Sequence, residues 1–125
     1  HENMGAELLK AAEMIVGKIE AATSVGVRQE SAPETLMEDI QRAIKKVDQK
    51  KGVLLLTDMF GGTPSNIALA YLGDAVEVIT GVNLSMLIKF ASHRDEKPLP
   101  ELAKLVQEAG QKSIIIASQM LKGKK

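Results

Sequence analysis

The feature that most constrains the fold is a continuous apolar run, Val53–Thr57, which is followed at once by Asp58. An apolar run without alternation is typical of a parallel strand that helices cover on both faces. Such a strand belongs to an α/β protein, in which strands and helices alternate along the chain. A carboxylate at the end of a buried strand is costly unless it has a partner, so Asp58 marks the place where chemistry is expected.

Helix and strand patterns alternate on both sides of this run. Apolar residues recur at helical spacing over Met4–Glu20, and Ser31–Glu34 has the spacing of a capping box that opens a second helix. Three further helices are expected from Thr63 to a cap at Gly73, from Leu84 to Phe90 and from Leu99 to Ala109. Strands are expected at Thr23–Val27, Val76–Thr80 and Ser113–Ile116.

This order predicts an α/β fold: a doubly wound, mostly parallel open sheet with helices on both faces. The stretch Ile67–Leu72 is apolar almost all round and should be deeply buried. The whole chain, residues 1–125, is expected to form a single domain, since its length fits one domain and it contains no linker or repeat.

Composition restricts the class of protein. Lys and Arg together number 16, as do Asp and Glu, so the chain lacks the net positive charge of a nucleic-acid or anionic-membrane binder. The absence of cysteine excludes disulfides and thiolate metal sites. No apolar run approaches the roughly 20 residues that a membrane span needs, and the expected location is the cytoplasm.

The segment Thr57–Pro64 (Thr-Asp-Met-Phe-Gly-Gly-Thr-Pro) joins the apolar strand to the next helix. In open α/β sheets, ligands bind beyond the carboxyl ends of the strands. Gly61 and Gly62 permit a tight turn with inward-facing N–H groups, Thr63 supplies a hydroxyl, and the helix presents its positive end. The segment therefore predicts a phosphate site. The alternative is that Asp58 and Thr63 are helix caps and the glycines only make a turn; no Walker Gly-Lys-Ser/Thr follows.

The same segment closely resembles the hallmark loop of the mannose-type IIA components of the bacterial sugar phosphotransferase system. The resemblance runs through Leu56–Asn66 and continues at Gly81–Met86, which is similar to the second loop of that family. Glu7–Leu9 and Ala12–Met14 resemble its first helix. The resemblance covers essentially the whole chain, and Asp58–Pro64 is its most specific part.

The resemblance implies the roles of the site residues. In the family, the phosphorylated histidine stands seven residues before the first leucine of a Leu-Leu pair in the first helix. His1 stands seven residues before Leu8 and so matches this spacing. His1 would then be the catalytic nucleophile, and Asp58 would hydrogen-bond its other ring nitrogen, fixing the tautomer and stabilising the cation. Gly61, Gly62 and Thr63 would bind the phosphoryl oxygens. Such a site needs no metal or other cofactor of its own.

The alternative interpretation of His1 is a purification-tag remnant. Two departures from the family pattern stand out. The strand that precedes the histidine in the family is absent, so we expect roughly eight residues of an apolar first strand to be missing from the sequence. Ser85 occupies a position that is usually proline. The other histidine, His93, is expected to be a solvated loop residue, and the resemblance suggests that Arg94 lies near the rim of the site.

The implied function is a phosphotransferase relay. His1 would accept phosphate from the histidine-containing phosphocarrier protein and pass it to a IIB component for sugar uptake, meeting the membrane only through the permease. Both partners would dock over His1, with Met59 and Phe60 at the edge of a shallow apolar surface. Family members form dimers, often by exchanging the last strand, and Ile114–Ile116 is compatible with an exchanged, antiparallel strand.

Two alternatives remain open. One is a receiver-like domain that is phosphorylated on Asp58 itself, although such a domain needs a bound magnesium ion and an acidic pair at the end of an earlier strand. The other is a regulatory or binding module of the same fold, in which the phosphate signals a state instead of feeding transport.

Overall fold

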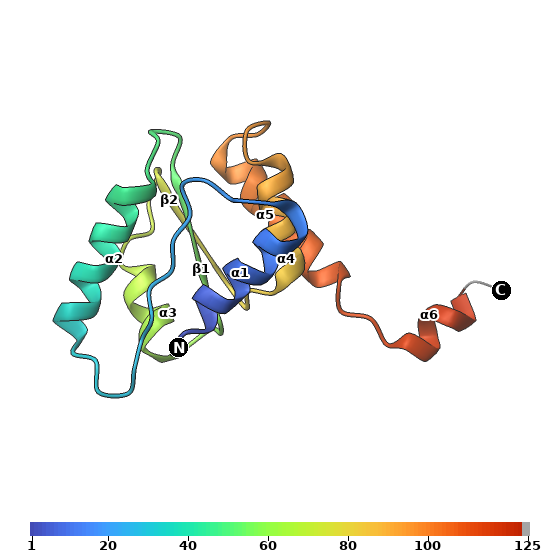
Figure 1. Ribbon diagram of the computed structural model, residues 1–125, viewed down its shortest axis with the longest axis horizontal. Helices are drawn as coiled ribbons and strands as arrows, with labels where there is room; N and C mark the ends of the chain where they lie inside the picture. Colours follow the sequence, from blue (N-terminus) through green and yellow to red (C-terminus); the bar gives the residue numbers. More distant parts are fainter. Residues whose placement is uncertain (124–125) are drawn as a thin grey trace.

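A pair of parallel strands lies at the centre of the computed structural model, which describes residues 1–123 (Figure 1). The elements in chain order are α1 (Met4–Val16), α2 (Pro33–Val47), β1 (Val53–Thr57), α3 (Gly62–Leu69), β2 (Val76–Thr80), α4 (Leu84–His93), α5 (Leu99–Lys112) and α6 (Ala117–Gly123). The predicted α/β class is confirmed, because a small parallel sheet is combined with helices. Residues 124 and 125 of the predicted domain lie outside the described residues.

Strand β1 is covered on both faces, as its unbroken apolar run predicted. On one face Leu55 packs against a cluster built around Leu36 and Ile40 of α2. On the other face Leu54 and Leu56 pack against a cluster of Met86, Leu102 and Val106 from α4 and α5. Successive side chains of a strand point to opposite faces, so one short strand supports two apolar layers.

The two strands pair in a register that leaves one edge of each without a strand partner. Val53 N donates to Ala75 O over 2.8 Å, and Gly81 N donates to Thr57 O over 2.9 Å. In this register the backbone groups of Val53, Leu55 and Thr57 point toward β2, and those of Leu54 and Leu56 point away from it. The outward groups need hydrogen-bond partners, since backbone amides and carbonyls are rarely left unpaired when buried.

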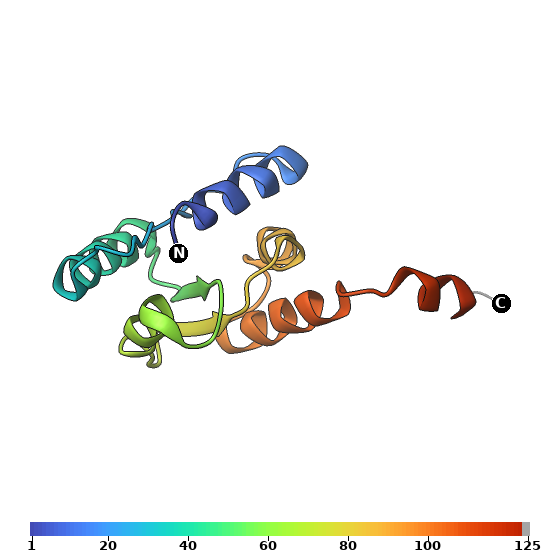
Figure 2. The same cartoon turned by 90° about the horizontal axis from the view of Figure 1, so that it is seen from below.

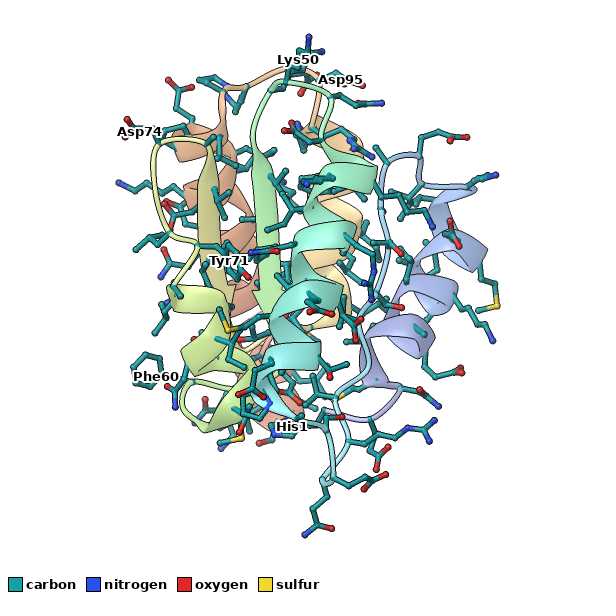
Figure 3. All side chains as sticks on the ribbon, turned by 90° about the vertical axis from the view of Figure 1, so that its left-hand side faces the viewer. His1, Lys50, Phe60, Tyr71, Asp74 and Asp95 are labelled. Atoms are coloured by element: carbon teal, nitrogen blue, oxygen red, sulfur yellow. The ribbon has the colours of Figure 1, made fainter. Side chains whose placement is uncertain are left out.

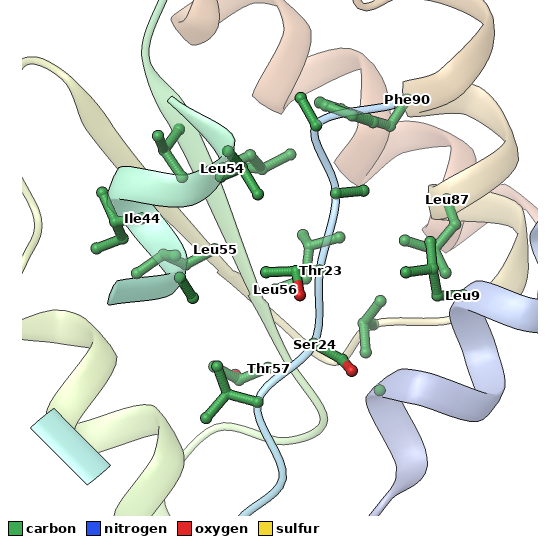
Figure 4. Close-up of a pocket in the computed structure, with 18 of the residues that line it drawn as sticks. Leu9, Thr23, Ser24, Ile44, Leu54, Leu55, Leu56, Thr57, Leu87 and Phe90 are labelled. Atoms are coloured by element: carbon green, nitrogen blue, oxygen red, sulfur yellow. The ribbon is translucent and has the colours of Figure 1, made fainter. Parts of the chain in front are cut away.

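A cavity of about 710 Å³ runs along this outer edge of β1, between the strand and the segment Thr23–Val27 (Figure 4). We call it the edge cavity. Apolar side chains from several elements line it, among them Leu9 of α1, Ile44 of α2, Leu54 and Leu56 of β1, and Leu87 of α4. His1 and Asp58 lie at one end of the same cavity.

The predicted strand at Thr23–Val27 is wrong for the described structure. That segment makes a single isolated antiparallel bridge, between Glu2 and Val27, and forms no strand. The physical reason is that the edge cavity separates it from β1, so it has no neighbouring strand with which to form a ladder. The sheet within residues 1–123 is therefore narrower than the open, doubly wound sheet that the sequence predicted.

Ser113–Ile116 forms no strand within the single chain described, and its exchange between two copies stays a prediction. The three isoleucines, Ile114 to Ile116, lie outside any strand and are exposed, and they lead into α6, which stands apart from the other helices (Figures 1 and 2). A β-branched run forms a strand only where it finds an edge to pair with.

Two helix predictions also need correction. α1 ends at Val16 and does not continue to Glu20, because Gly17 adopts a φ of 86° that terminates a right-handed helix. The stretch Ile67–Leu72 is only partly buried: Ala68 is buried, but Leu69 and Leu72 are 40% and 53% exposed. None of the described helices combines the length and apolar character that crossing a membrane requires.

We predict that Gly110→Ala destabilises the protein although alanine favours helices. A Cβ at Gly110, in α5, would lie 2.6 Å from Cγ and 2.8 Å from Sδ of the buried Met86. Overpacking of a core costs about 1–3 kcal/mol. The gain in helix propensity from glycine to alanine is only roughly 1 kcal/mol, so the packing cost outweighs it. Urea unfolding followed by circular dichroism should show a reduced free energy of unfolding. The neighbouring exposed Gln111→Ala is the control, and equal stability of the two variants would contradict this packing.

Candidate functional site

The carboxyl end of β1 brings the predicted site residues together. Asp58 follows the strand directly, and the turn that leads into α3 contains Gly61 and Gly62, with φ values of 87° and 82°. An alanine would be strained at either position, so the turn requires glycine. The second loop closes the same end, because Gly81 N and Val82 N both donate to Thr57 O at 2.9 Å.

His1 is held against Asp58 by two contacts. Nδ1 of its ring lies 2.7 Å from Oδ2 of Asp58, and the N-terminal amino group of His1 donates to the same oxygen over 2.9 Å. The Asp58 side chain is only 13% exposed, and that of His1 is 46% exposed. A largely buried carboxylate on Nδ1 favours the tautomer in which Nδ1 carries the proton and Nε2 has the lone pair.

The free face of the His1 ring is turned toward Gly62. A Cβ at Gly62 would lie 3.5 Å from Cε1 and 3.7 Å from Nε2 of His1, whereas a Cβ at Gly61 would meet nothing within 4 Å. Thr63 is exposed in the first turn of α3, where backbone N–H groups have no helical partner. The arrangement therefore presents a nucleophilic nitrogen beside a turn and a helix end that favour negative charge.

Two buried oxygens at this end of the sheet have no hydrogen-bond partner among the described residues: Oδ1 of Asp58 and Oγ of Ser65. Ser65 is fully buried in α3, although the sequence pattern assigned it no role beyond belonging to the motif. Burial of its side chain is a tertiary property that no local sequence signal reveals. Within residues 1–123, Oδ1 of Asp58 therefore lacks a hydrogen-bond donor, and an unpaired buried acceptor lowers the stability of the folded state.

The structure also gives the positions of Met59, Phe60 and Ser85, three residues singled out from the sequence. Phe60 is 74% and Met59 54% exposed, on the loop beside His1, and Figure 3 shows Phe60 and His1 at the same end of the molecule. Ser85 lies in the first turn of α4. Within residues 1–123, no three His, Asp or Glu side chains gather as the ligands of a metal ion would.

Arg94 and His93 lie at the opposite end, so the suggested position of Arg94 near the rim of the site is wrong. Arg94 follows the C-terminus of α4, where its guanidinium donates to the carbonyls of Glu20 and Ala21 and stacks 4.9 Å from the Phe90 ring centre. α4 starts beside the site and runs away from it, which carries its last residues to the far end. His93 is the last residue of α4 and is not in a loop; its Nδ1 lies 2.6 Å from Oε2 of Glu96.

Comparison with known proteins identifies relatives over almost the whole chain. The family model described as "EIIA-man: PTS system fructose IIA component" matches residues 1–107. The PTS system mannose-specific EIIAB component of Escherichia coli K12 is 38% identical over 111 residues, which are 86% of this chain and 34% of that protein. The chain thus spans about a third of the length of this relative.

A relative of similar size and a solved structure agree with this match. The PTS system fructose-specific EIIA component of Bacillus subtilis is 28% identical over 123 residues, covering 97% of this chain and 84% of that protein. The crystal structure of the PTS IIA protein associated with the fucose utilization operon of Streptococcus pneumoniae superposes with a TM-score of 0.83 and 29% identity, covering 97% and 90% of the two chains. The chain therefore belongs to the mannose/fructose family of IIA components of the phosphotransferase system.

Proposed function

We propose that this chain is a phosphocarrier that accepts a phosphoryl group on His1 from the histidine-containing phosphocarrier protein and passes it to a IIB component for sugar uptake. The observation that carries the proposal is the 2.7 Å contact between Nδ1 of His1 and Oδ2 of Asp58, which leaves Nε2 facing the Gly61–Gly62 turn. The relay places the chain in the cytoplasm, with access to the membrane only through the permease.

The transfer step follows from the geometry. The lone pair of Nε2 attacks phosphorus; the bond between phosphorus and the donor's histidine nitrogen breaks, and its electron pair returns to that nitrogen. The His1 ring becomes cationic while Nδ1 keeps its proton, and the carboxylate of Asp58 stabilises that cation. The Gly61–Gly62 turn and the first turn of α3, with Thr63, offer N–H groups and a hydroxyl to the phosphoryl oxygens. The onward transfer reverses these roles.

The same geometry favours His1 over Asp58 as the phosphoryl acceptor. Oδ2 of Asp58 already accepts two hydrogen bonds from His1, and Oδ1 is buried. An aspartate that acted as the nucleophile, as in a receiver-like domain, would need an accessible oxygen. A regulatory module of the same fold would share the site, and only onward transfer to a IIB component distinguishes the two roles.

Both protein partners must reach Nε2 of His1, and the exposed side chains of Met59 and Phe60 lie on the loop after Asp58, at the same end of the molecule as His1 (Figure 3). Exposed aromatic and methionine side chains are enriched at protein–protein interfaces. We assign to them the rim of the surface on which the donor and the acceptor dock in turn.

A homodimer is part of the proposal, with Ser113–Ile116 exchanged as a strand. The outer edge of β2 is open from Val78 to Thr80: within residues 1–123 the partner of Val78 N is Oε1 of Glu77, its neighbour, at 3.2 Å. A groove lined by β2 and by α5 residues runs along this edge, and Ile114 lies at one end of it. Exposed β-branched residues and an open strand edge are complementary, so an edge of this kind is covered by a second copy.

The edge cavity supports a further part of the proposal: an extended apolar strand that leads into His1 fills it. The outward N–H and C=O groups of Leu54 and Leu56 would gain partners, and so would Oδ1 of Asp58 at the end of the cavity. β1 has five residues, so a strand that pairs along its whole length needs about five to seven. The same segment would fix the position of the His1 backbone.

We predict that the chain gains one acid-labile, base-stable phosphoryl group when it is incubated with phosphoenolpyruvate and the two general phosphotransferase proteins. Intact mass spectrometry should show no gain for His1→Ala and full gain for the control His93→Ala. Asp58→Asn should slow the gain by roughly 10²-fold or more, because the His1 tautomer and its cation lose their partner. A hydroxylamine-sensitive phosphate would move the acceptor to Asp58, and a folded sample that stays unmodified would remove the relay function.

We predict that Gly62→Ala slows phosphorylation more than Gly61→Ala. Both variants place alanine at a positive φ, which costs about 1–2 kcal/mol. Only the methyl group at position 62 stands 3.7 Å from Nε2 of His1, in the path of the phosphoryl group. Phosphorylation rates measured by intact mass, normalised to the folded fraction, separate obstruction from strain. Equal rates in the two variants would show that the Gly62 side of the ring is not the side of attack.

We predict that eight alternating valine and isoleucine residues placed before His1 stabilise the protein and speed phosphorylation, because they supply a strand for the edge cavity. Thermal unfolding should shift to higher temperature relative to the 125-residue chain. The matched control is an extension of the same length made of glycine and serine, which cannot bury apolar surface. If both extensions leave the unfolding temperature and the rate unchanged, the edge cavity does not hold a strand.

A further inference from the structure

The helix α6 presents an apolar face that the described chain leaves uncovered. Ala117, Met120 and Leu121 fall on one face at helical spacing, while Ser118, Gln119 and Lys122 fall on the other. Met120 is 43% and Leu121 63% exposed. A helix of seven residues is not stable alone in water, so this face needs an apolar surface to pack on.

Two exposed leucines, Leu69 and Leu72, lie at the C-terminal end of α3 and just beyond it. Leu69 and Leu72 are both exposed and adjacent, since Leu72 N donates to Leu69 O over 3.2 Å. The next residue, Gly73, exchanges two backbone hydrogen bonds with Val76, the first residue of β2. Leu69 and Leu72 therefore lie beside the N-terminal end of the open β2 edge.

The proposed strand exchange connects these two surfaces. If Ser113–Ile116 pairs antiparallel with β2 of a second copy, the segment starts near Thr80 of that copy and ends near its Val78, because the N and O atoms of Val76 are already bonded to Gly73. α6 follows directly after Ile116, so it emerges at the end of β2 where Leu69 and Leu72 lie. A parallel pairing would deliver α6 to the other end, among the polar side chains of Asn83 and Gln111, and antiparallel pairs are also slightly more stable.

We propose that α6 docks across the dimer, with Met120 and Leu121 packed on Leu69 and Leu72 of a second copy of this chain. The inference rests on the strand exchange that is part of the proposed function. By symmetry each copy gives one helix and receives one, so the contact is closed and two-fold. The contact sets the direction of the exchanged strand, because only the antiparallel direction brings the two apolar surfaces together.

The absence of cysteine from the chain makes a direct test possible. Full-length copies that carry only Leu72→Cys are co-expressed with mass-tagged copies that carry only Met120→Cys or only Leu121→Cys, and mild oxidation follows. A disulfide between the two kinds of copy is intermolecular by construction and requires Cα atoms within about 7 Å. We expect the mixed disulfide-linked dimer in at least one pairing.

The matched control replaces Leu72→Cys with Met14→Cys, an apolar position on α1 that is more accessible, at 83% exposed against 53% for Leu72. This pairing reports random collision and should give several-fold less linked dimer. Sedimentation velocity of each reduced mixture separates the outcomes. A dimer that does not link through position 72 overturns the α6 docking and leaves the strand exchange standing. A monomer overturns both, while the phosphorylation of His1 remains a separate question.

Discussion

The backbone pairing of β1 is the constraint on which the rest of the structure depends. Its register with β2 turns the groups of Val53, Leu55 and Thr57 to one side and those of Leu54 and Leu56 to the other. Its alternating side chains hold the two apolar layers. Its last carbonyl, Thr57 O, accepts both Gly81 N and Val82 N, so the loops after β1 and β2 close over the same end of the sheet. The site exists because both strands deliver their carboxyl ends to one place.

The site couples charge placement to the fold. A largely buried carboxylate beside Nδ1 orients the His1 ring, and the positive end of α3 lies on the side where negative charge would arrive in the proposed transfer. The proposed strand in the edge cavity would contribute to both, since it would pair with β1 and carry His1 to Asp58. Stability and phosphoryl acceptance would then depend on the same few backbone hydrogen bonds.

Among the described residues, each outer edge of this small sheet has backbone groups without a strand partner. The two edges differ in the kind of segment that could pair with them. The β1 edge faces a cavity enclosed by α1, α2 and α4, which suits a segment joined to His1. The β2 edge faces outward, where Ile114–Ile116 and α6 extend away from the body of the protein (Figure 2). In the proposed dimer, two-fold exchange would cover the β2 edge of each copy with the apolar arm of the other.

Local sequence was sufficient for β1, β2 and the position of most helices, because unbroken apolar runs and helical spacing act over a few residues. It also predicted that Asp58, Gly61 and Gly62 would gather at a strand end, since turn chemistry and strand polarity are local properties. Tertiary structure alone decided the rest. It sent Arg94 to the far end and left Leu69 and Leu72 exposed. The contact of His1 with Asp58 spans 57 positions of the chain, so no local pattern predicted it and only the family resemblance implied it. It also left Thr23–Val27 and Ser113–Ile116 without strand partners, because a β-prone segment becomes a strand only when another strand lies beside it.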